Sequence, residues 1–352
     1  MSELVIRDFK IMTKNVPLKQ PFITALHRVD AIQAVKVKVI LNNGIFGIGS
    51  CTPNEKVTGD TLTSCRQILQ EVICPALRGQ SFENWEELLK KLKETIQGNT
   101  PAKAAVEIAL YDARRKWFQV SLCQLLGGKP RPVMTDYTIS IGQPEAMIAQ
   151  AKKMVSEGFT DLKIKLGRQP LKEEISTVEA ISDAVGSNID LRLDINQDWT
   201  VKKTMIAIDQ WHQADLNIAF IEQPLPAQDL AGMSFLTAHS CFPIMADESV
   251  FSFADAAKLL QMHACDYLNI KLMKTGGLSE AEKINALAEL YGVKTMVGCM
   301  IESVESIAAA VAFAAAHHNV GFVDLDSIFM ADQDPELINY VTLKRNEIHL
   351  KA

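Results

Sequence analysis

The spacing of hydrophobic positions changes within the first third of the chain. Over residues 3–49, apolar and polar side chains alternate in several stretches, for example Ala34–Ile40, which the turn residues 42–44 follow. This alternation is typical of half-buried strands and predicts an antiparallel meander. Over residues 61–118 the apolar positions recur at helical spacing. Strands followed by helices predict an α+β domain.

A second pattern begins after residues 126–132, where glycine and proline cluster. Beyond them, short apolar runs alternate with helical stretches. We predict strands at residues 133–141, 161–166, 191–195, 218–222, 244–246, 267–270, 295–297 and 321–325. Eight strands that alternate with helices are enough to close a parallel barrel. We expect two further strands, at 341–343 and 348–350, to return to the first domain.

Charged residues end most of these apolar runs. They are Lys163 and Lys165, Asp194, Glu222, Asp247, Lys271, and Asp324 and Asp326. From Lys165 to Lys271 the steps between them are 24 to 29 residues, about the length of one strand, one helix and two loops. Residues at the carboxyl ends of successive barrel strands converge on one pocket. The spacing therefore predicts an active site.

Lys163 and Lys165 flank Ile164, so on a strand both ammonium groups point to one face. If that face is the barrel interior, anions must offset the cost of burying two like charges. The alternative is a pair of solvated lysines on an edge strand. Leu162 and Leu166 argue against it, because with Ile164 they mark the other face as buried.

Asp194, Glu222 and Asp247 each follow an apolar run. Oxygen ligands from three strands, with room left for substrate and water, suit Mg²⁺. No histidine or cysteine stands at these positions, so zinc or copper fits poorly. Each acid taken alone is equally compatible with the N-cap of the helix that follows it.

Lys271 ends the run 268–271 and precedes the glycines of Lys274–Gly277. It should face Lys165 across the acids. Two lysines on opposite sides of a bound carboxylate form a pair of bases for proton transfer, because either can remove an α-proton and the other can return one. We expect Lys274 to be a solvated neighbour.

Composition narrows the classes of function. The 352 residues carry a formal charge of −6 without a basic stripe, which argues against a nucleic-acid partner. No apolar run approaches the length of a membrane span, and the first residues lack the core of a secretion signal. Seven scattered cysteines without a C-x-x-C pair argue against a disulfide framework or structural zinc site. We therefore expect a cytoplasmic protein with no membrane partner.

The charged positions belong to five short motifs. They are Lys163-x-Lys165, Asp194-x-Asn196, Glu222-Gln-Pro224, Asp247-Glu-Ser249 and Asn269-Ile-Lys-x-x-Lys-x-Gly-Gly277. Together they resemble the muconate-lactonizing-enzyme subgroup of the enolase superfamily. The resemblance implies Mg²⁺ held by Asp194, Glu222 and Asp247, with Lys165 and Lys271 as the acid/base residues. It also implies that Lys163 neutralises a bound carboxylate.

The same resemblance implies a (β/α)7β barrel with an α+β capping domain. On this basis we predict three segments. Residues 1–125 form the α+β capping domain that sets substrate specificity, residues 126–330 form the barrel, and residues 331–352 return to the capping domain. We also expect a homo-oligomer.

Asp324 and Asp326 flank Leu325 and should place two carboxylates on one face at the barrel mouth. Two acids beside an anion-binding site favour a cationic ligand. The pair resembles the motif with which dipeptide epimerases hold the α-ammonium group of their substrate, and Thr138 and Cys299 match further substrate-binding positions of that group. A helix cap or a surface turn is the alternative interpretation.

The expected reaction is Mg²⁺-dependent epimerisation of an L,L-dipeptide to the L,D form, by proton transfer at the α-carbon of the carboxyl-terminal residue through an enediolate. N-acylamino-acid racemase, o-succinylbenzoate synthase and muconate cycloisomerase activities are alternatives within the same subgroup. The substrates of those enzymes have no free amine that Asp324 and Asp326 could bind. A catalytically inactive barrel that serves as a binding protein is the alternative from another class.

Substrate preference should depend on two loops of the first domain, residues 21–28 and 52–59. Members that resemble alanyl-glutamate epimerases tend to carry arginine at the position of His27. This chain departs from that pattern. A neutral imidazole binds a carboxylate less strongly than a guanidinium group does, so a glutamate side chain and a broader or apolar preference both remain open. Arg28 should point the other way on an extended loop.

Overall fold

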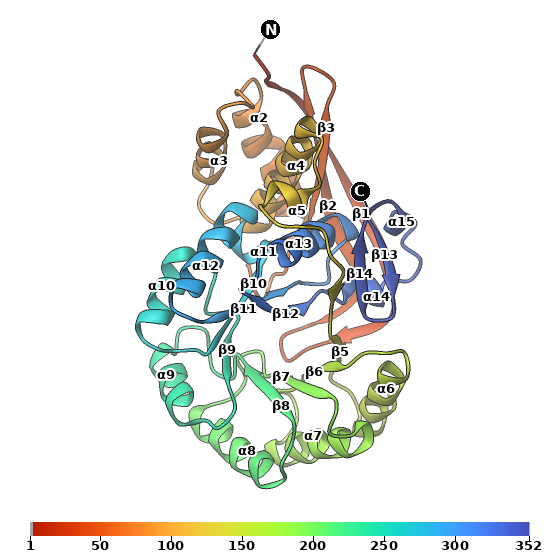
Figure 1. The fold of residues 1–352 in the computed structure, drawn as a ribbon, viewed down its shortest axis with the longest axis vertical. Coiled ribbons are helices and arrows are strands. Elements are labelled where there is room, and N and C mark those ends of the chain that lie inside the picture. Colours follow the sequence, from red (N-terminus) through yellow and green to blue (C-terminus); the bar gives the residue numbers. More distant parts are fainter. Residues whose placement is uncertain (1–2, 352) are drawn as a thin grey trace.

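The computed structural model describes residues 3–351, and its first element is the predicted meander. Strands β1 (Ile6–Ile23), β2 (Arg28–Leu41) and β3 (Phe46–Cys51) form an antiparallel sheet in that order. Valines at alternate positions of β2 are buried, as the alternating pattern predicts. The sheet rises beside a group of helices at one end of the molecule (Figure 1).

The helices of this domain lie where the helical spacing begins. They are α1 (Leu62–Ile68), a π-helical turn η1 (Leu69–Ile73), α2 (Cys74–Leu77), α3 (Trp85–Glu94), α4 (Thr100–Phe118) and α5 (Leu122–Leu125). Helix α4 is buried over most of its length and packs on β3. This contact requires glycine, because a Cβ atom at Gly47 would lie 1.9 Å from the Ala109 carbonyl oxygen. At Gly49 it would lie 2.2 Å from that of Ala105.

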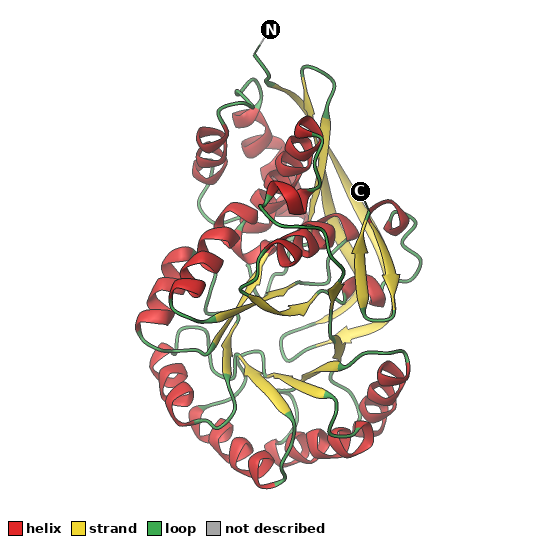
Figure 2. Cartoon of the chain, in the orientation of Figure 1, coloured by secondary structure: helices red, strands yellow, loops and turns green. Residues whose placement is uncertain are grey.

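The second part of the chain is an eight-stranded parallel sheet that curls into a barrel, with helices around its outside (Figure 2). Its strands are β5 (Tyr137–Ile139), β6 (Asp161–Lys165), β7 (Asp190–Asp194), β8 (Ile218–Glu222), β9 (Ile244–Ala246), β10 (Tyr267–Lys271), β11 (Lys294–Gly298) and β12 (Val320–Asp324). Its helices are α6 (Pro144–Ser156), α7 (Leu171–Val185), α8 (Val201–Gln213), α9 (Leu230–His239), α10 (Phe253–Gln261), α11 (Leu272–Thr275), α12 (Leu278–Leu290) and α13 (Val304–Ala316). The predicted (β/α)7β barrel with an α+β capping domain is confirmed.

The first predicted barrel strand, residues 133–141, needs a correction. It is divided into β4 (Val133–Met134) and β5, and only β5 joins the barrel. Strand β4 pairs instead with the last strand of the chain. Thr135 and Asp136 lie between the two short strands, so the chain changes sheets at the barrel rim. An apolar run alone does not reveal such a change of partner.

The barrel closes between β5 and β12 through separate hydrogen bonds rather than a regular ladder. The amide of Asp136 donates to the Val323 carbonyl at 3.3 Å. The amide of Thr138 donates to Asp326 Oδ2 at 2.6 Å, and the amide of Leu325 donates to the Thr135 hydroxyl at 2.8 Å. We call this set of contacts the barrel seam. The side chain of Asp326, which is predicted to lie near the substrate, thus also helps to close the barrel.

The last part of the chain forms α14 (Ser327–Met330), α15 (Leu337–Tyr340), β13 (Val341–Lys344) and β14 (Glu347–Leu350). Strand β13 pairs with β14, and β14 pairs with β4, so these strands form a sheet separate from the meander. The segment does contact that sheet through side chains, because Lys14 and Lys36 pair with Glu336 at 2.7 and 2.6 Å. The proposed domain limits at residues 125 and 330 stay a prediction.

One buried carboxyl group of the capping domain contacts the barrel directly. Glu107 of α4 accepts hydrogen bonds from the Ser279 amide at 2.6 Å and the Ser279 hydroxyl at 3.1 Å, at the start of α12. Ser279 lies in the first turn of α12 and is held there by Glu107. Gly277 leaves room for this contact, since a Cβ atom there would lie 2.4 Å from Glu107 Cδ. Burial raises the pKa of Glu107 to about 7.

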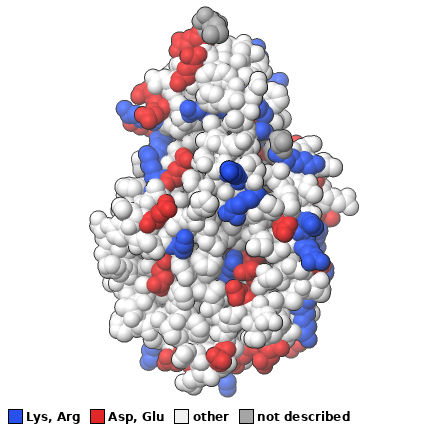
Figure 3. All heavy atoms as spheres, viewed as in Figure 1, with Lys and Arg blue, Asp and Glu red and all other residues white. Residues whose placement is uncertain are grey.

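Positive and negative side chains are interspersed on the face of the molecule that Figure 3 shows. Among residues 3–351, every helix is too short or too polar to cross a bilayer.

Candidate active site

The charged residues that end the barrel strands come together at the barrel end that faces the capping domain. Lys163 and Lys165 lie on β6, Asp194 ends β7 and Glu222 ends β8. Further around the barrel, Asp247 follows β9, Lys271 ends β10 and Asp324 ends β12. All seven side chains are buried. The predicted convergence of the strand ends is therefore observed, although each residue's role stays a prediction.

Lys163 lies at the centre of the group. Its Nζ is 2.7 Å from Asp324 Oδ2, 2.8 Å from Glu222 Oε2 and 3.1 Å from Asp194 Oδ2. Burial lowers the pKa of Lys163, but the surrounding carboxylates outweigh burial and hold the pKa well above its ordinary value. The residue is thus a fixed cation, as expected from the cost of burying it, and the edge-strand alternative is excluded.

Asp194, Glu222 and Asp247 place one carboxylate oxygen each within 4.8 Å of one another. Burial raises the pKa of Asp194 and Asp247, but nearby lysines reverse this and hold both values below the ordinary one. Glu222 differs, because burial and Asp194 raise its pKa to about 8. Glu222 Oε2 also accepts no hydrogen bond of good geometry, although Lys163 lies nearby. Three buried carboxylates that offer only oxygen ligands suit a hard divalent cation such as Mg²⁺.

Lys165 and Lys271 contact different members of the acid group. Lys165 donates a hydrogen bond to Asp194, and Lys271 Nζ lies 2.6 Å from Asp247 Oδ2. Burial lowers the pKa of Lys271, but Asp247 outweighs burial and raises it above the ordinary value. The two ammonium groups thus approach the pocket from strands β6 and β10, with the acids of β7 and β8 and the loop after β9 between them.

Lys274 is not solvated, so the prediction for this residue is wrong. Its side chain is fully buried, and Nζ donates to Asp247 Oδ1 and to the Asn269 carbonyl oxygen at 2.9 Å. Helix α11 begins directly after Lys271 and turns Lys274 back toward the acids. No local pattern indicates this, because one helical turn after a strand reverses the direction of the side chain.

Asp324 and Asp326 lie on the opposite side of the pocket from Lys271. Both are buried, and burial together with Asp324 raises the pKa of Asp326 to about 7. The Thr138 amide donates to Asp326, while Cys299 lines the same pocket. The alternative of a surface turn is excluded by this burial. Asp326 does stand at the start of α14, but its side chain makes no capping hydrogen bond there.

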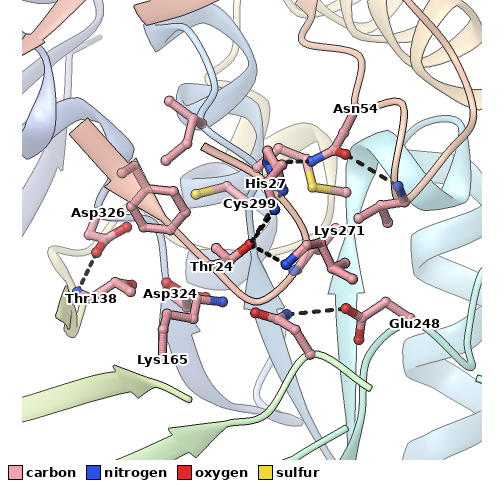
Figure 4. A pocket seen from close by; sticks show the side chains of 16 residues that line it. Thr24, His27, Asn54, Thr138, Lys165, Glu248, Lys271, Cys299, Asp324 and Asp326 are labelled. Atoms are coloured by element: carbon pink, nitrogen blue, oxygen red, sulfur yellow. Dashed lines mark hydrogen bonds between the residues drawn. The ribbon is translucent and has the colours of Figure 1, made fainter. Parts of the chain in front are cut away.

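The capping domain supplies the remaining wall of the pocket (Figure 4). Phe22, Thr24, Leu26, His27, Asn54 and Val57 line a cavity of about 50 Å³ together with the barrel residues. The Nδ1 atom of His27 lies 3.3 Å from the Thr24 hydroxyl, and Nε2 lies 3.1 Å from Asn54 Nδ2. Both loops predicted to set specificity therefore reach the pocket.

Three residues of the site were missed by the sequence analysis. Asn196 donates to Glu248 Oε1 at 3.1 Å, and both line the pocket beside the acids predicted to bind Mg²⁺. Asp136 lies with Asp324 and Asp326 in a second acidic group and pairs with Arg192 at 2.8 Å. Asn196 and Glu248 belong to two of the sequence motifs. Their positions just after strand ends could therefore have identified them as site residues. Asp136 lies in the irregular segment before β5 and had no such signal.

Two family models match the chain. The model of the mandelate racemase/muconate lactonizing enzyme N-terminal domain covers residues 6–127. The model of the enolase C-terminal domain-like family covers residues 146–350. The two matches together cover most of the meander domain and the barrel.

Among the similar proteins with known names or structures, three illustrate the likeness. The L-Ala-D/L-Glu epimerase of Clostridium acetobutylicum is 42% identical over 331 residues, which are 94% of this chain and 92% of that protein. The substrate-liganded L-Ala-D/L-Glu epimerase of Bacillus subtilis has a TM-score of 0.95 at 40% identity, covering 99% of this chain and 96% of that one. The dipeptide epimerase of Enterococcus faecalis, complexed with Mg and L-Leu-L-Tyr, has a TM-score of 0.93 at 35% identity, with coverages of 99% and 97%.

Proposed function

Since this chain belongs to the mandelate racemase/muconate lactonizing enzyme family of the enolase superfamily, we propose that it is a Mg²⁺-dependent dipeptide epimerase. It converts L,L-dipeptides to L,D-dipeptides at the carboxyl-terminal residue. The observation that carries this proposal is a single pocket with two lysines on facing sides and a buried acidic pair at its edge. The epimerases named above are similar over nearly their whole length, which supports it.

The carboxylate of the dipeptide binds at the floor of the pocket. Lys163 supplies a permanent positive charge there, and Asp194, Glu222 and Asp247 would hold Mg²⁺. An α-proton beside a carboxylate is barely acidic in water, because its removal gives a doubly charged enediolate. When bound, Mg²⁺ supplies positive charge that stabilises this enediolate and offsets the acids that keep the neighbouring lysines protonated.

Lys165 and Lys271 exchange the proton. Each ammonium group is paired with an acid in the structure, so one of them must be neutral before it can remove the α-proton. The lysine on the far face then donates a proton to the planar carbon, and the configuration inverts. The same two groups serve the reverse reaction with their roles exchanged.

Asp324 and Asp326 bind the α-ammonium group of the dipeptide. Asp326 lines the pocket, where burial and Asp324 raise its pKa to about 7. A free ammonium group at this position would favour the charged carboxylate. This pair would distinguish a dipeptide, which has a free α-ammonium group, from an N-acylamino acid, which has no charged nitrogen there.

Proton NMR in deuterated water tests the proposal. The purified protein with Mg²⁺ is incubated with L-Ala-L-Leu, L-Ala-L-Phe, L-Ala-L-Glu and L-Ala-L-Lys, and separately with N-succinyl amino acids. We expect the α-proton signal of the carboxyl-terminal residue to disappear while the L,D diastereomer forms. Exchange only with N-succinyl substrates would contradict the role of Asp324 and Asp326 but not that of the lysines. No exchange with any substrate would contradict the epimerase assignment.

Two predictions about the setting of the enzyme remain. All seven cysteines are free thiols, which supports the reducing cytoplasm. The homo-oligomer is checked by light scattering coupled to gel filtration, where a monomer mass of 38.9 kDa would contradict it.

A further inference from the structure

The arrangement of the pocket fixes where the side chain of the epimerised residue must lie. This step rests on the proposed function. The α-carbon lies between Lys165 and Lys271, its carboxylate faces the barrel floor, and its nitrogen leads toward Asp324 and Asp326. A tetrahedral carbon then has one substituent left, and it points toward the wall that the capping domain supplies. His27 and Asn54 are the polar centre of that wall (Figure 4).

Hydrogen bonds hold the His27 imidazole in one neutral tautomer. Asn54 Oδ1 accepts from the amides of Lys56 at 3.0 Å and Val57 at 3.2 Å, which fixes the orientation of the Asn54 amide group. Its Nδ2 atom must then donate to His27 Nε2, so that nitrogen is an acceptor. The proton of the neutral imidazole is on Nδ1 and is directed at the Thr24 hydroxyl. Neither nitrogen is free to donate to a carboxylate in the pocket.

The environment of His27 also opposes its protonation. Burial lowers the pKa of His27, and Lys165, Arg168 and Lys271 lower it further, while only Glu55 acts in the opposite direction. A protonated ring would also have to break its hydrogen bond with Asn54, because both nitrogens would then be donors. The imidazole therefore remains a hydrogen-bond acceptor at neutral pH.

The described residues of this pocket supply no further cation, whereas Arg28 and Lys56 line an adjoining cavity that shares His27 and Asn54. Among the described residues that line the catalytic pocket, the positive side chains are Lys165 and Lys271, and both flank the α-carbon. Arg28, next to His27, is exposed and pairs with Asp30 at 2.9 Å. The neighbouring side chains Phe22, Leu26, Val57, Met300 and Ile301 are apolar.

We propose that this enzyme selects dipeptides whose carboxyl-terminal side chain is uncharged and apolar, and that His27, held by Thr24 and Asn54, excludes an acidic side chain. A glutamate carboxylate placed against this wall would lose its hydration and gain no donor from His27. A branched aliphatic or aromatic side chain loses nothing there and buries apolar surface. The proposed preference differs from the substrate in the names of the two L-Ala-D/L-Glu epimerases compared above.

Initial rates with the panel of L-Ala-L-Xaa dipeptides test the preference. We expect kcat/KM for L-Ala-L-Leu or L-Ala-L-Phe to exceed that for L-Ala-L-Glu by about tenfold or more, the usual discrimination by a desolvated apolar pocket. Equal or better turnover of L-Ala-L-Glu would overturn the inference while leaving the epimerase assignment intact. Absence of α-proton exchange with every dipeptide would instead contradict the proposed function itself.

A pair of variants assigns the selection to His27. We expect His27→Arg to raise kcat/KM for L-Ala-L-Glu by about tenfold and to lower it for L-Ala-L-Leu, because a guanidinium group binds a carboxylate with two hydrogen bonds. Arg28→Gln is the matched control and should leave the ranking of the panel unchanged. A fall in L-Ala-L-Glu turnover confined to Arg28→Gln would show that Arg28 serves the side chain and would overturn the proposal.

A measurement without substrate tests which tautomer of His27 is present. Two-dimensional ¹⁵N–¹H NMR of the histidine rings distinguishes a protonated from an unprotonated nitrogen. We expect His27, assigned through the His27→Arg variant, to carry its proton on Nδ1 between pH 6 and 8. In Asn54→Ala the Nε2 atom loses its donor, and a mixture of tautomers should follow. A doubly protonated His27 at pH 7 in the unmodified enzyme would refute the argument.

Discussion

The barrel floor and the wall of the capping domain differ in how their polar groups are held. On the floor, four buried lysines and the acids of the strand ends contact one another directly, for example at 2.7 Å between Lys163 and Asp324. On the wall, His27, Thr24 and Asn54 form a neutral chain of hydrogen bonds within two loops. A charged network stabilises charge that develops in a reaction, whereas a neutral wall selects by shape and desolvation. This difference supports the proposal that the barrel performs the chemistry and the capping domain sets the substrate preference.

Removal of a lysine from the floor should have the largest effect. We expect Lys271→Ala to lower kcat for epimerisation by at least about 100-fold, the usual contribution of a positioned acid or base. It should still allow deuterium exchange from one diastereomer, because Lys165 can act on its own face. NMR of the L,L- and L,D-dipeptides in deuterated water measures both. Lys172→Ala, which replaces an exposed lysine after β6, is the control. Unchanged epimerisation in Lys271→Ala would contradict the two-base assignment.

Removal of the metal tests the other half of the floor. Dialysis against EDTA should abolish exchange, and Mg²⁺ should restore it. Titration calorimetry should detect Mg²⁺ binding by the unmodified protein and none by Asp194→Asn. Asp326→Asn is the matched control, because it removes a buried acid outside the proposed ligand group. Equal Mg²⁺ affinity in all three proteins would show that Asp194 is not a ligand.

The acidic pair allows a finer test of substrate selection. Asp326→Asn keeps an oxygen that can accept from the Thr138 amide but loses the charge. We expect KM for L-Ala-L-Leu to rise about tenfold or more, as is usual when a charge-assisted hydrogen bond is lost. KM for N-propionyl-L-Leu, which lacks the amine, should not change. A similar rise for both compounds would mean that Asp326 has only a structural role at the barrel seam.

The final expected effect is on stability rather than on catalysis, and it concerns the support that the capping domain gives to the barrel. The folded state holds the proton of Glu107 up to about pH 7, whereas the unfolded chain releases it near 4.5. Glu107 therefore favours the folded state below pH 4.5, and this advantage is lost as the pH rises to about 7. The difference in unfolding free energy between the unmodified protein and Glu107→Gln should fall by up to about 3 kcal/mol over this range. Urea unfolding from pH 5 to pH 8 measures it, and a constant difference would contradict the buried-acid account.

The contrast between floor and wall also explains which parts of the site are predictable from the sequence. Residues of the floor end regular strands, so their spacing alone predicts that Lys163, Asp194, Glu222 and Lys271 lie close together. Asp324 and Asp326 follow from the same alternation. The meander and seven of the eight barrel strands are predicted correctly because each has a clear hydrophobic period, whereas the first barrel strand is shorter than predicted.

What escaped prediction lies where the chain leaves regular structure. The one-turn helix α11 buries Lys274, and the short segment between β4 and β5 places Asp136 beside the acidic pair. The partner of Asn54 also depends on how two loops, more than 20 residues apart, meet in space. The pairing of β14 with β4 joins parts of the chain that are about 200 residues apart, and no local pattern predicts such a pairing.

The barrel seam has a consequence for the order in which the protein is made. Its contacts join residues up to 190 positions apart, and they include Asp326, which also lies in the proposed amine site. A chain emerging from the ribosome can form the meander and the early strands before β12 exists. Asp194, Glu222 and Lys165 would then be in place while the barrel is still open. The proposed amine site is therefore completed last, so under this proposal a partly synthesised chain cannot yet bind the ammonium group of a dipeptide.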